Sequence, residues 1–466
     1  MLKTLLNVFR VPELRNKILF TLFMLAIYRI GFSIPLPGVD QEVLRQTIEQ
    51  QQQNSNDPAK RLASYVSTFS GGNINQSTIF GLGVMPYISA SIIVQLLGTV
   101  IPALEKLKKE GQTGQRKMQE WTRYLTVILA IIQGGFWLGY LRSKGEIDST
   151  FFAMYPTAWM VLSITILVTS SVFLMWLGEQ IDEYGLGNGV SLLIMAGILS
   201  QLPGALTTVY SDYLVGGQGG DSTGPGKAVF LLVSFVVVTA FAIYITQAQR
   251  RITIQQAKFT RGRKVYGGQK QYLPLRLNHG GVMPVIFAQS LMIVPSLFIG
   301  WLHNYFTTGK AGAILQFLYD HLSQPGTYIY VVIELAMIYF FAYFWTTVQF
   351  QPKEMATQLR DYGSFVPGIR PGKRTADYLE GVMYRITYVG AAFLCVVAVI
   401  PAILAMEFHI NYRVASFLGG TGLLIVISVA LDLVQRIEAN LLMRNYGGFL
   451  GGEGGSGRAG IRGSRR

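Results

Sequence analysis

The chain of 466 residues has little charge, a single cysteine and only four histidines. Asp, Glu, Lys and Arg make up 14% of it, about half the share found in soluble domains. With Cys395 as the single cysteine, no intrachain disulfide can form. His279, His303, His321 and His409 are scattered without the spacing of metal ligands. We therefore expect no metal centre and no cofactor.

Motifs for nucleotide chemistry are also missing. The nearest approach to a phosphate-binding loop is 221–229, which reads DSTGPGKAV. It has Asp221 in place of the first glycine, and Ala228 where a Mg²⁺-binding Ser or Thr belongs. No nucleophile–base pair and no embedded dyad is visible, so we expect a protein that is not an enzyme.

Ionisable residues inside apolar runs are the usual marks of proton or ion coupling, and they are few here. Arg29, Arg385 and Asp432 lie near the ends of their runs, where snorkelling or pairing is sufficient. Glu334 lies a little deeper. Because a carboxylate near a membrane interface is more often solvated than coupled, we interpret Glu334 as solvated.

In place of charge, the sequence has long apolar runs, and 50% of its residues are hydrophobic. A helix needs about 20 such residues to cross a hydrocarbon core of about 30 Å. Ten runs meet this requirement: 18–34, 79–101, 121–140, 157–177, 188–206, 228–248, 281–303, 329–349, 382–404 and 414–434. The predicted fold class is an all-α polytopic membrane protein.

The net charge of +14 is distributed unevenly over the loops. Ten spans place both termini on one side, and most Lys and Arg residues lie in the tails and loops of that side. The acidic loop 178–187 is an exception. By the positive-inside rule, both termini are expected in the cytoplasm.

Two loops on the basic side stand out. Loop 249–280 has many Lys and Arg residues and no acid, which fits either topology and lipid contact or docking of an anionic partner such as ribosomal RNA. Loop 350–381 contains VPGIRPGKR, and topology has no need for its prolines and glycines, so docking is favoured there. The Gly-rich tail 447–466 is expected to be disordered, in contact with lipid, RNA or nothing.

Two short glycine-containing stretches precede apolar runs. Pro86 is expected in the first turn of its helix, where a missing N–H costs no hydrogen bond, after a turn containing Gly81 and Gly83. The stretch GLGNGVS (185–191) is expected to cap a helix and to allow close packing.

Seven stretches, in order along the chain, together carry a specific resemblance. They are RIGFSIPLPGVD (29–40), IFGLGVMPYISASIIVQLL (79–97), KKEGQTGQRKMQEWTRYLT (108–126), FLMWLGEQIDEYGLGNGVS (173–191), AKFTRGRKVYGGQKQYLPLRLNHGGVMPVIFA (257–288), FVPGIRPGKRT (365–375) and FLGGTGLLIVISVALD (417–432). They resemble the SecY family, the central subunits of protein-conducting channels, and the similarity runs from about residue 5 to 445.

The resemblance implies ten helices in two pseudosymmetric five-helix halves around a central pore. The corresponding domains are a cytoplasmic amphipathic segment 1–17, an N-terminal half 18–210, a C-terminal half 211–434 and a basic tail 435–466. It also implies a short plug helix near 64–75, although an ordinary polar loop is an alternative there. The plug residues named are Ser64, Tyr65, Val66, Ser67, Thr68, Phe69, Ser70, Gly71 and Gly72.

The resemblance also assigns roles to particular side chains, which by themselves would pass for ordinary membrane core. The implied pore ring consists of Val84, Ile88, Val190, Ile194, Ile286 and Ile425, with valine at two positions where the family commonly has isoleucine. The implied lateral gate between spans 2 and 7 contains Ser89, Ile92, Ser290 and Val294. The implied docking residues for a motor ATPase or ribosome are Arg250, Arg251, Arg263, Lys264, Arg370, Lys373 and Arg374.

The implied function is passage of unfolded secretory chains, with lateral release of transmembrane segments into the membrane. The implied partners are the channel subunits SecE and SecG, the motor ATPase SecA, ribosomal RNA and proteins, secretory and membrane protein substrates, and lipids. A secondary transporter is the main alternative and would need a polar site at mid-membrane. A polytopic membrane enzyme, the other alternative, would need embedded His, Asp or Cys groups.

Overall fold

The computed structural model is mainly helical. It describes residues 12–39, 77–143, 155–210, 225–407 and 420–450, with short gaps at 258, 262–263, 267, 269, 279, 290, 293–298, 300–309 and 323–326. The helices before residue 211 are α2 (Pro12–Gly31), α5 (Met85–Val100), α6 (Pro102–Lys109), α7 (Gln112–Ser143), α8 (Pro156–Tyr184), α9 (Gly189–Leu199) and α10 (Leu202–Val209).

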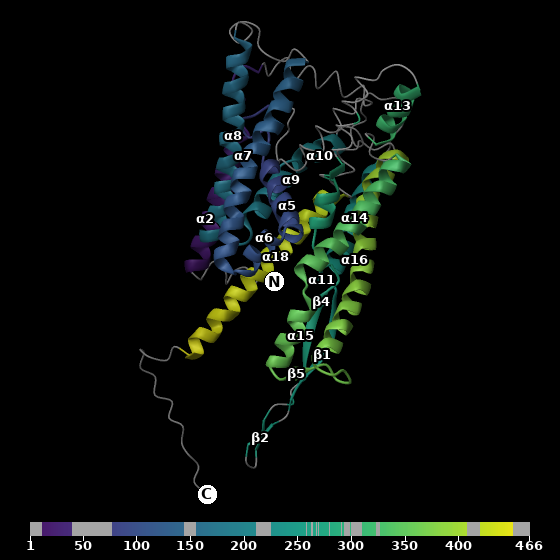
Figure 1. Cartoon of the computed structure of the whole chain (residues 1–466). Coiled ribbons are helices and arrows are strands. Elements are labelled where there is room, and N and C mark those ends of the chain that lie inside the picture. Colours follow the sequence, from purple (N-terminus) through teal and green to yellow (C-terminus); the bar gives the residue numbers. More distant parts are fainter. Residues whose placement is uncertain are drawn as a thin grey trace.

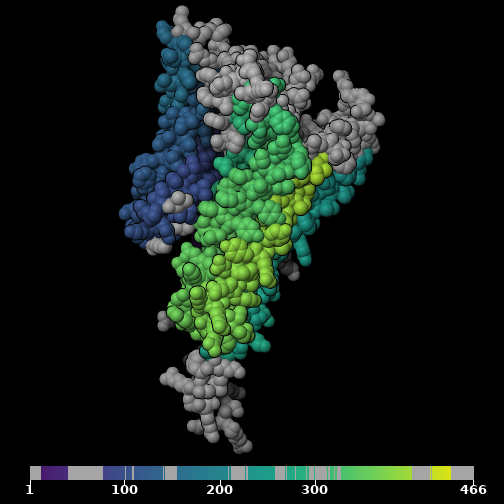
Figure 2. Space-filling model, turned by 45° about the vertical axis from the view of Figure 1, so that its right-hand side comes forward, coloured from purple at the N-terminus to yellow at the C-terminus, as the bar shows by residue number. Residues whose placement is uncertain are grey.

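The later helices form the second half of the molecule. They are α11 (Pro225–Gln247), α13 (Lys310–Leu322), α14 (Tyr328–Gln349), α15 (Pro352–Asp361), α16 (Lys373–Glu407) and α18 (Thr421–Leu450). The purple-to-blue early helices and the green-to-yellow later helices lie side by side, and α18 crosses between them (Figures 1 and 2). The early and the later helices thus form the two halves of the described structure.

Several helices have the length and composition of membrane spans. Among the described residues, five helical stretches qualify: Pro156–Tyr184, Gly189–Thr207, Val229–Gln247, Tyr328–Asp361 and Lys373–Ile400. The apolar helix over Met85–Thr99 is shorter. The count of ten spans stays a prediction, because several predicted runs fall partly outside the described residues.

Helix ends differ from the predicted bounds where polar residues continue a helix. Helix α2 begins at Pro12, inside the predicted segment 1–17. Helix α8 continues to Tyr184, so most of the predicted acidic loop 178–187 is helical. Helix α18 continues to Leu450, so the first residues of the predicted disordered tail are helical. Hydropathy predicts where a helix leaves the hydrocarbon core of the membrane. The helix itself can continue beyond that point, as long as its backbone hydrogen bonds continue.

The two basic loops join in one small sheet that the sequence analysis did not predict. Strand β1 (Gln249–Gln256) pairs antiparallel with β4 (Lys270–Arg276) and with β5 (Ser364–Phe365), so loop 350–381 adds an edge strand to loop 249–280. Strands β2 (Phe259–Arg261) and β3 (Lys264–Tyr266) form a separate hairpin. The buried residues Ile252 and Ile254 alternate with more exposed ones, as in a strand with one covered face.

This sheet has its own apolar core beside α15 and α16. Buried members of this cluster are Ile252, Leu275, Phe350, Val366, Leu379, Val382, Met383 and Ile386. The sheet, the start of α2 and the end of α18 all lie on one side of the helices (Figure 1). Both ends of the described chain therefore lie on the side of the basic loops, as the predicted topology requires.

The turn between α8 and α9 brings the two helices unusually close. Asn188 caps α9 by accepting a hydrogen bond from the Ser191 N–H at 3.0 Å. A Cβ atom placed on Gly189 would overlap the carbonyl group of Gly178 on α8. The expected cap and close packing of 185–191 are thus confirmed.

Replacing Gly189 with alanine is expected to lower stability by about 2–3 kcal/mol, because the carbonyl of Gly178 belongs to a helix backbone and cannot move aside. Thermal unfolding of the purified protein in detergent measures the effect. Gly204→Ala is the matched control, since a Cβ there meets nothing within 4 Å. An unchanged unfolding midpoint for Gly189→Ala would contradict the close packing of α8 and α9.

Candidate functional site

The six residues predicted as a pore ring meet in one apolar cluster at the junction of the two halves. Val84, Ile88, Ile194, Ile286 and Ile425 are only 1–8% exposed and belong to the same buried cluster, and Val190 packs against it. They come from four separate elements: α5, α9, the helical segment 283–289 and α18. Solvent hardly reaches these side chains, so the structure brings the six predicted ring residues together in one buried apolar contact.

The start of α5 fixes two of these residues. Val84 occupies the N-cap position of α5, and Pro86 lies in the first turn, which confirms the sequence prediction. Gly83 precedes them with φ of +56°, a backbone conformation that glycine adopts without strain. The Ile88 N–H donates to the Val84 carbonyl at 3.0 Å, so the two side chains lie one helical turn apart.

The start of α9 fixes another two. Besides the cap by Asn188, the Asp182 carboxylate on α8 accepts a hydrogen bond from the Gly189 N–H at 2.7 Å. Val190 packs directly over Gly178, with Cγ2 3.1 Å from where a Cβ would stand. The acidic end of α8 was the exception to the predicted positive-inside pattern. In the structure, it anchors the helix that carries Val190 and Ile194.

A second apolar cluster lies entirely in the later half and touches the first through two residues. It joins α11, segment 283–289, α14, α16 and α18. Ile92 of α5 and Val282, just before segment 283–289, pack against both clusters. Of the predicted lateral-gate residues, Ile92 thus lies on the seam between the halves and Ser89 lies beside it on α5, half-buried. Ser290 and Val294 lie outside the described residues.

The predicted plug lies outside the described residues as a whole, from Ser64 to Gly72 and on to residue 75. The described chain resumes at Ser77, whose carbonyl accepts from the Leu36 N–H at 2.8 Å. Ile79 in turn donates to the Ile34 carbonyl at 3.0 Å. The chain that leads into α5 is therefore tied to the segment just after α2.

Five of the seven basic residues predicted for docking lie on the small sheet, or on the loop that leads from β5 into α16 and the first turn of that helix. Arg250 and Arg251 lie on β1 and are exposed. Lys264 belongs to β3, and Arg263 lies outside the described residues. Arg370, Lys373 and Arg374 are exposed, the last two at the start of α16. Pairing of β5 with β1 brings these two groups, far apart in sequence, into one body.

The loop before α16 exposes the side chain of Arg370, while hydrogen bonds fix the backbone of the loop. Val366 is buried in the core of the sheet, and the Ile369 N–H donates to the Val366 carbonyl at 3.1 Å. The Thr375 hydroxyl donates to the Arg370 carbonyl at 2.9 Å. Gly368, with φ of +84°, makes the tight turn possible. The side chain of Arg370 is therefore presented to solvent from a rigid frame.

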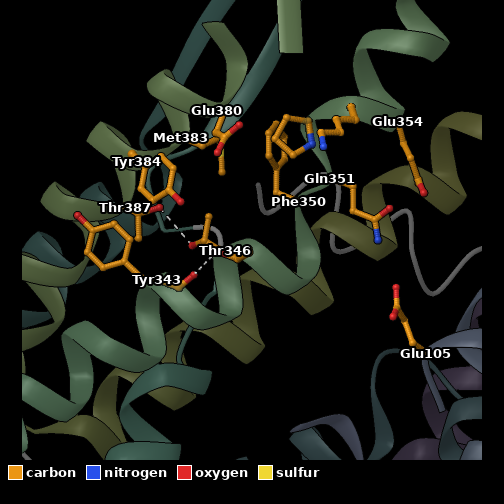
Figure 3. Close-up of a pocket in the computed structure, with 13 residues that line it drawn as sticks. Glu105, Tyr343, Thr346, Phe350, Gln351, Glu354, Glu380, Met383, Tyr384 and Thr387 are labelled. Atoms are coloured by element: carbon orange, nitrogen blue, oxygen red, sulfur yellow. Dashed lines mark hydrogen bonds between the residues drawn. The ribbon is translucent and has the colours of Figure 1, made fainter. Parts of the chain in front are cut away.

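A cavity of about 450 Å³ opens near this body, lined mainly by α14, α15 and α16 (Figure 3). At one end, Thr387 on α16 donates to the Thr346 hydroxyl on α14 at 3.2 Å. At the other end, Glu105 of α6 lies across open space from Gln351 and Glu354. The two halves of the molecule therefore both contribute to this cavity.

Glu334 is the residue for which the sequence interpretation was wrong. It is 7% exposed on α14, so it is buried and not solvated. Gln289, on segment 283–289, donates a hydrogen bond from Nε2 to Glu334 Oε1 at 3.3 Å. The sequence did show a polar residue in each of two consecutive apolar runs, Gln289 in one and Glu334 in the other. It did not indicate that the two side chains are in contact.

The fold defines a class: a helical protein with several helices long and apolar enough to span a membrane, whose early and later helices share one buried aliphatic cluster. The SecY family model matches residues 78–434. Relatives named protein translocase subunit SecY are 40% identical in Streptomyces scabiei, over 97% of this chain and 100% of the relative, and 41% identical in Corynebacterium glutamicum, over 96% and 100%. The chain belongs to the SecY family and is a multi-pass membrane protein.

Solved structures show the same fold at much lower identity. A structure described as a protein-conducting channel has a TM-score of 0.58 at 17% identity, covering 92% of this chain and 93% of the other. Sec61 in the canine ribosome–channel complex of the endoplasmic reticulum has a TM-score of 0.56 at 17% identity, covering 92% and 93%. These similarities concern the fold alone.

Proposed function

We propose that this chain is the channel subunit through which unfolded secretory polypeptides cross the cytoplasmic membrane and from which transmembrane segments leave sideways into the lipid. The observation that supports the proposal is the convergence of six branched aliphatic side chains, from the early and the later helices, in one buried cluster, which we interpret as the closed constriction of the channel. Membership of the SecY family and the fold of known protein-conducting channels support it.

An aliphatic ring suits a channel that must accept any sequence. Side chains that hydrogen-bond would retain polar cargo, whereas branched aliphatics bind no particular group. A narrow apolar constriction also excludes water and ions while it is closed, because hydrating it is unfavourable. During passage, the same side chains close around the moving polypeptide. The ring thus combines permissive passage with a seal, and the chain itself carries out no catalysis.

Lateral release requires the two halves to separate along an apolar seam. Ile92 and Val282, which pack against both clusters, support a seam between α5 and the span that contains segment 283–289. An apolar seam permits hydrophobic segments to partition into lipid when it opens, whereas polar segments continue through the ring. Ser89, Ser290 and Val294 are proposed members of the same gate, and residues 64–75 are the proposed plug.

The driving force for polypeptide passage comes from partners that dock on the basic residues of the small sheet and its neighbouring loops. Arg250, Arg251, Arg263, Lys264, Arg370, Lys373 and Arg374 are proposed to dock the motor ATPase SecA or the ribosome, whose RNA is anionic. Solved neighbours include channel complexes bound to ribosomes, Sec61 from dog and Ssh1 from yeast. SecE and SecG are the proposed companion subunits. Both termini and the small sheet then lie in the cytoplasm.

A photo-crosslinking experiment tests this function. A photo-reactive residue replaces Ile194, and a secretory polypeptide is stalled halfway across the membrane. The expected result is a crosslink from position 194 to the stalled polypeptide, because Ile194 belongs to the ring. Position 167 is the control, since Leu167 on α8 is buried in a different cluster. No crosslink from 194, with the polypeptide stalled and the probe active, would reopen the transporter alternative.

A further inference from the structure

Segment 283–289 presents two faces to two different clusters. Ile286 belongs to the constriction, whereas Val285, Phe287 and Ala288 pack against α14 and α16. The Phe287 ring lies 5.4 Å from that of Phe341 and 5.2 Å from that of Trp345, between centroids. The position of Ile286 in the ring therefore depends on how the opposite face is held.

The α14 side of this contact is one stripe of residues at helical spacing. Ile338, Phe341 and Trp345 supply its apolar part, and all three are at most 7% exposed. Glu334 precedes Ile338 by four residues, so it continues the same stripe. It faces Gln289, which follows directly after the buried Ala288. The polar pair thus extends an otherwise apolar interface.

Such a pair is unfavourable to bury unless it has a role. A carboxyl group inside a membrane protein loses its hydration, and the amide of Gln289 offers only partial replacement. Glu334 lies on α14, which contributes no residue to the ring cluster, so the pair adds no side chain to the ring itself. What it does provide is a directional contact, which apolar packing alone lacks.

We propose that Glu334 is a positioning residue of the channel: through its hydrogen bond to Gln289 it holds segment 283–289 on α14 and so keeps Ile286 in the closed ring. The proposal rests on the proposed channel function. Opening of the ring must displace at least one of its four elements, and this contact restrains one of them. The strength of the contact between Glu334 and Gln289 therefore determines the ion flux through the resting channel.

The test uses the complete channel complex in lipid vesicles and measures the passive flux of a small ion with a trapped dye, without cargo. Glu334→Leu and Gln289→Leu are each expected to raise the resting flux about three- to tenfold, the effect of losing one interhelical hydrogen bond in a membrane. The exchange variant Glu334→Gln/Gln289→Glu, which keeps a carboxyl–amide pair, is expected to restore the original flux. Glu334→Gln alone should raise the resting flux less than Glu334→Leu does. It replaces the leucine variant in the test if that variant does not fold.

Thr387→Val is the matched control. It removes a buried hydrogen bond between α16 and Thr346 of α14 that does not involve segment 283–289, so it should lower thermal stability without raising the flux. Unchanged flux in both leucine variants would overturn the proposal. So would failure of the exchange variant to restore the flux, or an equal leak in Thr387→Val. The crosslink at position 194 is measured separately, so failure of the channel function would be recognised independently.

Discussion

Arg370→Glu is expected to reduce motor-driven passage of a secretory polypeptide by at least about a hundredfold, because a like charge placed at a docking interface costs several kcal/mol. The side chain is exposed, and the backbone beneath it is held by Thr375 and by the buried Val366. Charge reversal therefore changes the surface offered to the motor without disturbing the loop. Protein level, membrane insertion and thermal unfolding should all match the original protein.

Passage is measured in vesicles that contain the channel complex, with the motor ATPase, ATP and a labelled secretory polypeptide. Arg360→Glu is the control, since Arg360 lies on nearby α15 and its exposed side chain forms an ion pair with Asp361 at 3.3 Å. A surface pair of this kind contributes little to stability, so the control should transport normally. Normal transport by Arg370→Glu would remove this residue, and with it the loop, from the docking surface.

Ile425→Asp is expected to raise the resting ion flux by about tenfold or more, because a carboxylate draws water into a constriction that seals by excluding it. Ile425 is 2% exposed in the ring cluster, so the charge would face the other five aliphatic side chains. The same change should lower thermal stability, since it buries a carboxylate among aliphatic side chains.

Ion flux through vesicles without cargo measures the first effect, and unfolding in detergent measures the second. Val434→Asp is the matched control on the same helix, because Val434 is 41% exposed and lies outside the ring cluster. It should change neither quantity appreciably. A tight resting channel in Ile425→Asp, with passage of cargo retained, would show that the seal lies elsewhere.

Features encoded by neighbouring residues could be predicted well. The apolar runs predicted the helical class. The sequence around Pro86 predicted that this residue lies in the first turn of α5, and the glycines around Gly189 predicted the close contact of α8 and α9. The acidic residues at the end of α8 were harder, because their role is to cap and anchor neighbouring helices. Asp182 binds the Gly189 N–H, and Glu179 forms a two-pronged ion pair with Arg123 of α7.

Features that depend on distant segments could not be predicted from residue patterns. The alternation around Ile252 is too short to indicate a strand, and its sheet is completed by β5, from the other basic loop. Glu334 appeared to be a solvated residue near an interface until Gln289 of another span was placed beside it. Even the six ring residues were distinguishable from ordinary core only by resemblance to a family.

The sequence by itself determined that this protein is helical and crosses a membrane several times, and it places most of its basic residues in the tails and loops predicted for one side, because composition and local periodicity fix those properties residue by residue. Only the tertiary structure decided that aliphatic side chains from four elements meet in one buried cluster, that two basic loops share one sheet, and that a buried carboxyl group on α14 is hydrogen-bonded to the segment carrying Ile286. Each of these is a meeting of distant segments, and helix packing, not local sequence, determines which side chains meet.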